Sequence, residues 1–164
     1  MVLIIASISG FIGFQFNSNS SQQELEYYAQ KVDDLNTELA TTQLKSASTS
    51  DRIQAINTLE FVNLNEDVIV KKLVNKLLYD DNLHVRMAAG KSLLAFNTNT
   101  EVMPAVIKAI RTETELLVQA TLIDILITLD KNTAIKEIYR IYESESSSPE
   151  LRTIYQSILE SEHI

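Results

Sequence analysis

A repeat of 33 to 34 residues is the feature of this 164-residue chain that most restricts its fold. Three arginines and a glutamine recur at intervals of 34, 33 and 33 residues, and a leucine follows each of them seven residues later. A fixed period in this range is typical of helical solenoids, because a single helix pair cannot bury its own apolar face and must stack on its neighbours. We therefore predict an all-α chain that forms a short α-solenoid of helical pairs. The two series are Arg52, Arg86, Gln119 and Arg152, and Leu59, Leu93, Leu126 and Leu159.

The composition agrees with helices joined by short loops. The chain has only 3 glycines and 2 prolines, which leaves few residues for the turns of a many-stranded fold. Its net charge of −8 argues against nucleic acid as a partner, since phosphate binding requires a positive surface. It has no cysteine, which excludes disulfides and thiolate metal sites.

Residues 1–16 carry no charged side chain and are predicted to form a membrane-anchor segment. A helix of this length rises about 24 Å, against about 30 Å of bilayer hydrocarbon, so the span is either short or incomplete. Two other interpretations remain open. The segment lacks the basic start of an ordinary export signal but resembles one in its apolar run, and it is also compatible with a buried helix of a soluble protein.

The charge distribution after the apolar segment bears on its orientation. No lysine or arginine occurs between Asn17 and Gln30, so the positive-inside tendency gives no reason to keep the following chain in the cytoplasm. We expect a single span in a bacterial inner membrane, with the repeats in the periplasm.

Residues 17–50 are predicted to form a polar linker (17–21) and a stalk helix. Apolar side chains along the stalk are spaced by 3, 4, 3 and 4 residues, which is the spacing of a coiled-coil seam. Two interpretations of this seam are open: it docks on the first helix of the repeats, or it pairs with a second copy to form a homodimer. The seam consists of Leu25, Tyr28, Val32, Leu35 and Leu39.

Residues 51–164 are predicted to form the repeat domain, with repeats at about 51–80, 82–112 and 114–143 and a capping helix at 149–161. We expect Phe61 and Val68 to point inward with the leucines, and a helix over residues 85–96. Serines at 46–50 are candidate N-caps, as are Asn65 and Thr100 for the later helices. The helix at 116–129 is apolar on nearly all sides, which predicts that it lies buried between other helices.

The run Asp81-x-x-x-Val85-Arg86-x-x-Ala89-x-x-x-Leu93 resembles the short HEAT-like repeat of bacteria. In such a repeat we expect the arginine to lay its stem on apolar surface and to bind acids or carbonyls of the inter-repeat turns. Over roughly residues 20 to 160, the segments 46–52, 81–89 and 117–126 are similar to the extracytoplasmic HEAT-repeat region of bacterial membrane-anchored anti-sigma-factor proteins. That resemblance implies an anchored outer half, here without the sigma-binding part.

The sequence contains no pattern that predicts catalysis. It has no glycine-rich phosphate loop, no His-Glu-x-x-His and no nucleophile elbow, and its two histidines, His84 and His163, lack a second ligand at helical spacing. The carboxylate pairs are interpreted as caps and solvated positions. We expect no enzyme activity, no cofactor and no metal.

Half of the basic residues fall on the second helix of each predicted pair. In HEAT-like stacks these helices usually line the concave face, which predicts a locally basic groove for an acidic peptide or protein partner. The alternative is that they are ordinary solvated faces. The residues of this candidate groove are Lys71, Lys72, Lys76, Lys108, Arg111, Lys136 and Arg140.

Two classes of function follow from these features. The first is a membrane-tethered protein–protein interaction module with a regulatory or signalling role in the bacterial envelope. The second is a soluble HEAT-repeat adaptor or enzyme-accessory protein, with the apolar N-terminus packed on the solenoid.

Overall fold

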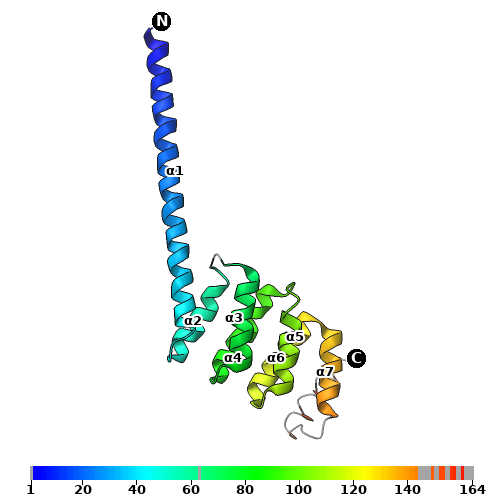
Figure 1. Cartoon of the computed structure of the whole chain (residues 1–164). Coiled ribbons are helices and arrows are strands. Elements are labelled where there is room, and N and C mark those ends of the chain that lie inside the picture. Colours follow the sequence, from blue (N-terminus) through cyan, green and yellow to red (C-terminus); the bar gives the residue numbers. More distant parts are fainter. Residues whose placement is uncertain are drawn as a thin grey trace.

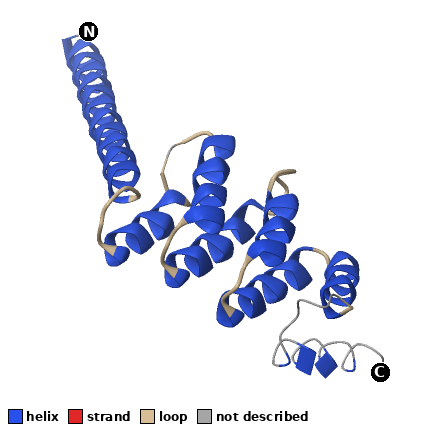
Figure 2. Cartoon of the chain, turned by 60° about the horizontal axis from the view of Figure 1, so that its bottom comes forward, coloured by secondary structure: helices blue, strands red, loops and turns tan. Residues whose placement is uncertain are grey.

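The structure is a computed structural model that describes residues 2–62 and 64–143 and also residues 149, 152, 153, 156, 157 and 160; for 2–20 and 142 it describes the backbone alone. These residues form an all-α fold without strands, as the sequence predicts (Figure 2). The helices are α1 (Val2–Gln43), α2 (Thr49–Leu59), α3 (Glu66–Tyr79), α4 (Leu83–Ser92) with a short 3₁₀ turn η1 (Leu93–Phe96), α5 (Val102–Thr112), α6 (Leu116–Leu129) and α7 (Lys131–Tyr142).

The helices from α2 onward pack in two rows (Figures 1 and 2). In one row α2 contacts α4 and α4 contacts α6, and in the other α3 contacts α5. Neighbours in the chain also pack across the rows, since α3 contacts α4 and α6 contacts both α5 and α7. Each helix is therefore packed against at least one neighbour in its own row or in the other row.

The repeated leucines lie at the centre of this packing. Leu59, Leu93 and Leu126 are fully buried, and they belong to one continuous apolar core that reaches from the end of α1 to α7. Helix α6 lies between α4, α5 and α7, which agrees with its apolar character. Leu117, however, is half exposed at the start of α6, so this helix is not buried on all sides.

Side-chain caps begin several helices where the sequence predicts them. The Ser48 hydroxyl accepts a hydrogen bond from the N–H of Asp51, and the Asn65 side chain accepts one from Asp67 at the start of α3. The prediction that Thr100 caps the next helix is wrong. The N-cap position of α5 is Glu101, and the Asn99 side chain accepts a bond from the Glu101 N–H instead.

Three further expectations are wrong in detail. Phe61 is 82% exposed because α2 ends at Leu59, so helical periodicity no longer applies to it. Val68 is 41% exposed because it lies in the first turn of α3, where Ile69 and Val70 already face the core. The predicted helix over 85–96 changes from α-helix to the tighter 3₁₀ form at Leu93, a common way to end a helix.

Helix α1 runs without interruption through the predicted linker at 17–21. No glycine or proline occurs in that stretch, and Asn and Ser are only mildly unfavourable inside a helix. Its C-terminal end packs against α2, burying Ala40 and Leu44, while the rest extends away from the other helices (Figure 1). Among the residues described, none of the helices combines the length and the apolar character needed to cross a lipid bilayer.

The stalk seam does not dock on the first helix of the repeats. All five of its side chains are 54 to 70% exposed. The contact with α2 is made by the last turns of α1, beyond the seam. The predicted capping helix over 149–161, including Leu159, lies largely outside the described residues.

Candidate partner-binding site

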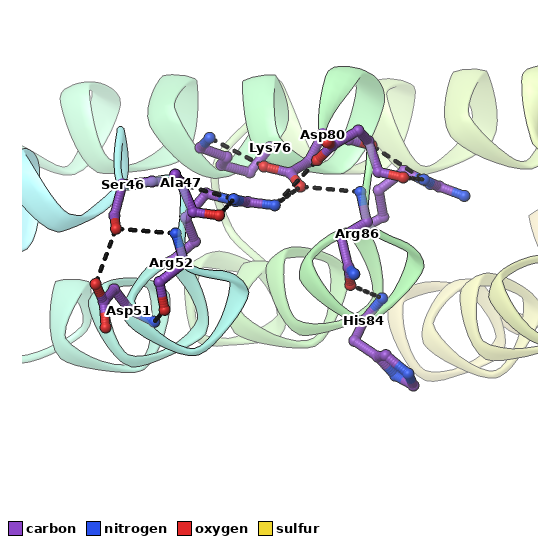
Figure 3. A network of polar contacts seen from close by, with 11 residues as sticks. Ser46, Ala47, Asp51, Arg52, Lys76, Asp80, His84 and Arg86 are labelled. Carbon is purple, nitrogen blue, oxygen red and sulfur yellow. Dashed lines mark hydrogen bonds and ion pairs between the residues drawn. The ribbon is translucent and has the colours of Figure 1, made fainter.

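Arg52 joins the end of α1 to the end of α3 (Figure 3). Its Nη1 donates hydrogen bonds to the carbonyl oxygens of Ser46 (3.0 Å) and Ala47 (3.1 Å), in the turn that follows α1. Its Nη2 donates to the carboxylates of Asp80 (2.9 Å) and Asp81 (3.0 Å), which follow α3. The planar guanidinium presents donors in a fixed fork, so a single side chain fixes both segments relative to each other.

Arg86 makes the same type of contact one repeat later. Its Nη1 donates to the carbonyl oxygens of Asp80 (3.0 Å) and Asp81 (3.2 Å), and its Nε and Nη2 donate to Glu113 (2.7 and 3.0 Å). Gln119, in the third repeat, donates from Nε2 to the Glu113 carbonyl at 2.7 Å. The prediction that this position binds the acids and carbonyls of the turns is confirmed for Arg52 and Arg86.

The acids of this network are held in their charged form. Burial acts most strongly on Asp80 and favours its neutral form, but the hydrogen bonds from Lys76, from the Asn82 N–H and from Arg52 together outweigh it, so the pKa of Asp80 lies below its ordinary value. The pKa of Glu113 is lowered in the same way, with burial opposed mainly by Arg86. The hydrogen bond to Glu113 raises the pKa of Arg86.

Several of the predicted groove residues are occupied by contacts within the chain. Lys76 forms an ion pair with Asp80 at 3.0 Å, and Arg111 binds Glu137 with a shortest distance of 2.7 Å. Arg140 lies 3.7 Å from the same Glu137 carboxylate. Each of these three cations is therefore paired within the chain, with Arg111 and Arg140 sharing the carboxylate of Glu137.

Two further groove residues lie on α5 and α7. Lys108 lies over the ring of Tyr79 on α3, 5.8 Å from its centroid, and its Nζ is 3.4 Å from the phenol oxygen. A cation over an exposed aromatic ring is stabilised by the ring quadrupole, although only by about 0.5–1 kcal/mol. Lys136 is exposed on α7. The seven predicted residues therefore do not form a single basic surface of free cations.

A different grouping of lysines surrounds a cavity of about 390 Å³ between the end of α1 and α3. We call it the lysine cavity. Among the described residues, no acidic side chain forms an ion pair with Lys45, Lys71 or Lys72, whereas Lys76 is paired with Asp80. The lining residues are Thr41, Leu44, Lys45, Val68, Lys71, Lys72, Asn75 and Lys76.

The lysine cavity combines positive charge with an apolar surface. Val68 is exposed there and the largely buried Leu44 forms part of the wall, so these two side chains give the cavity its apolar character. Its volume falls within the usual range of ligand sites, about 300–1,000 Å³. Three ammonium groups without an ion pair among the described residues, beside an apolar wall, suit a ligand that carries carboxylates next to an apolar side chain.

The sequence identified Lys71 and Lys72 as groove residues but missed Lys45. Lys45 follows the last turn of α1, and its place beside α3 depends on the angle between the two helices. Periodicity within a helix does not report that angle. The available signal was the Ser46–Arg52 segment, because an arginine that binds this turn brings the end of α1 toward α3.

The described residues offer no site for metal chemistry. Within the parts of the chain that the structure describes, no group of three or more His, Asp or Glu side chains could hold a metal ion. His84 is exposed in the first turn of α4, where its N–H donates to the Asn82 side chain. His163 lies outside the described residues.

Comparisons with protein-family models, with curated proteins and with solved structures found no match to this chain.

Proposed function

We propose that this protein is a protein–protein interaction module built of HEAT-like helical pairs, and that its lysine cavity binds an acidic segment of a protein partner. The observation that carries the proposal is the group of Lys45, Lys71 and Lys72, which form no ion pair among the described residues, beside Leu44 and Val68. The chain as a whole has a net charge of −8, so a local excess of positive charge is not a consequence of its composition.

The HEAT-like part of the proposal is supported by the repeat in the sequence and by the contacts it makes. Arg52 and Arg86 are 34 residues apart, and each binds the turn before its own helix and an acid that follows the helical pair it starts. Stacked helical pairs of this kind present long surfaces, which such proteins use for binding.

An envelope location is the second part of the proposal. It is supported by the sequence of residues 1–16, which carry no charge, and by the absence of Lys and Arg from residue 17 to 30. On this proposal the module is tethered to the bacterial inner membrane, faces the periplasm and has a regulatory or signalling role. A reporter that is active only outside the cytoplasm, fused after Ile164, tests it, and a fusion that is produced at full length but inactive would contradict it.

The binding proposal is tested with a fluorescent peptide that carries three glutamates next to a leucine. We expect saturable binding by fluorescence anisotropy, weakened by salt as for any contact between exposed charges. Reversal of two lysines, Lys71→Glu with Lys72→Glu, should weaken binding at least about fourfold, since two attractions of about 0.2–1 kcal/mol each become repulsions of similar size. Equal affinity of this variant and the natural chain would overturn the proposal.

A matched control separates the local site from net charge. Lys91→Glu with Lys136→Glu changes the net charge by the same amount at two exposed lysines, on α4 and α7. Neither lysine lines the lysine cavity. We expect this variant to bind the peptide within about twofold of the natural chain, because neither lysine lines the lysine cavity and exposed charges away from the ligand are screened by salt.

A further inference from the structure

The exposed seam of α1 is the largest regular apolar feature that the chain leaves uncovered within its described residues. Its side chains follow one another at 25, 28, 32, 35 and 39, and all of them are more than half exposed. Scattered exposed apolar residues are ordinary, but a row along one face of a helix marks a contact surface.

The contact between α1 and α2 does not cover this seam. Ala40 and Leu44 are buried at the C-terminal end of α1, immediately after Leu39, and this is the part that packs on α2. From Leu39 back toward the N-terminus, α1 extends away from the other helices (Figure 1). A partner for the seam must therefore come from outside the part of the chain that the structure describes.

The spacing of the seam favours another helix with the same spacing. Alternating steps of 3 and 4 residues keep one stripe facing a partner helix along a left-handed supercoil. With Leu25, Val32 and Leu39 as a positions, Tyr28 and Leu35 are d positions. A second copy of α1 has the same apolar residues at the same a and d positions, so the two stripes can face each other along their length.

The residues that flank the seam indicate a parallel arrangement. The e positions are uncharged, being Gln22, Ala29 and Asn36, so no like charges meet across a parallel pair. In an antiparallel pair the g positions face one another, and Glu24 then approaches Glu38 of the other helix. Like charges at such positions oppose association.

From this exposure and spacing we propose that α1 pairs in parallel with α1 of a second copy through Leu25, Tyr28, Val32, Leu35 and Leu39. The seam covers only about two heptads, so the pairing is expected to be weak in dilute solution. Each dimer then presents two lysine cavities on one stalk. If these bind as proposed above, two linked sites increase the avidity for a partner with two acidic segments.

Disulfide trapping tests this pairing directly, because the natural chain has no cysteine. Single cysteines are placed at Leu25→Cys and Val32→Cys in the seam, and Gln30→Cys provides the control on the opposite side of the helix. Mild oxidation of the full chain in detergent, followed by non-reducing gel electrophoresis, measures the dimer. We expect both seam cysteines to form a covalent dimer at least about tenfold faster than the control.

The pattern of trapping distinguishes the alternatives. In an antiparallel pair Leu25 faces the region of Leu35, so Leu25→Cys would not trap a dimer with itself. Equal rates for all three cysteines would show random collision. Either result would overturn the proposal.

A second variant removes the seam without touching the repeats. Val32→Glu with Leu35→Glu, added to Leu25→Cys, places charges on side chains that are already exposed in the monomer. We expect the trapped dimer to disappear while far-UV circular dichroism shows the same helical content. Trapping that persists in this variant would contradict a dimer held together by the seam.

Discussion

Arg86 and Glu113, which are 27 residues apart in the sequence, form a bidentate ion pair with Nε–Oε2 and Nη2–Oε1 distances of 2.7 and 3.0 Å. Arg52 bonds to Asp80 in the corresponding place, 28 residues along the chain. Each arginine starts one helical pair and binds the acid that follows the same pair. The turns on one side of the stack are thereby connected in series by charged side chains.

Removing one partner of this pair should be costly. Glu113→Gln leaves the Arg86 guanidinium, whose side chain is only 14% exposed, without its carboxylate. Breaking a buried pair from one side costs about 3 kcal/mol of the free energy of unfolding, because the remaining charge is not compensated. Urea denaturation measures this loss. Glu60→Gln, at an exposed position, should change the stability by less than about 0.5 kcal/mol.

The same carboxylates predict how stability depends on pH. The pKa values of Asp80 and Glu113 are lowered in the folded state from ordinary values of 3.8 and 4.5. Groups of this kind stabilise the fold above their unfolded pKa, and the stabilisation is lost as the pH falls through the folded pKa. We expect the melting temperature to fall when the pH is lowered from about 5 to 2, and to fall less in Glu113→Gln. A melting temperature that rises over this range would contradict the prediction.

The repeat in the sequence predicted the buried leucines and the bonds of the arginine position, because both follow from local spacing. The predictions that Phe61 and Val68 are buried were wrong because they extend the helical spacing of apolar residues too far. Phe61 follows the end of α2, and Val68 lies in the first turn of α3. The lysine cavity was not predicted as a unit. The cavity forms because the end of α1 lies beside α3 at a particular angle. Neither the composition of the linker nor the spacing of the seam predicts the angle between these two helices.

Close approach of α4 and α6 predicts the effect of adding volume at Gly90. A Cβ atom at this position would lie 3.0 Å from Leu122 Cδ2 and 3.2 Å from Ile125 Cδ1. Gly90→Val should therefore destabilise the fold by about 1–3 kcal/mol, since overpacking forces neighbouring side chains out of place. Thermal unfolding checks this. Lys91→Val, the next residue and exposed, is the control and should cost less than about 1 kcal/mol.

Arg52 should influence binding without touching the ligand. Arg52→Lys keeps the charge but cannot bind the Ser46 and Ala47 carbonyls and the Asp80 carboxylate in one fork. The end of α1 is then less well fixed against α3, and the affinity for the acidic peptide should fall several-fold. Arg86→Lys is the same chemical change one repeat later. It should reduce stability similarly but leave the affinity unchanged, which fluorescence anisotropy and urea denaturation together can show.

A charge-swap titration tests the central claim, that the lysine cavity recognises an acidic segment. The natural chain and the Lys71→Glu/Lys72→Glu variant are each titrated with the glutamate peptide and with a peptide in which lysines replace the glutamates. We expect the natural chain to bind only the acidic peptide, and the variant to bind the basic peptide better than the acidic one. If both proteins prefer the same peptide by the same factor, the lysine cavity is not the binding site.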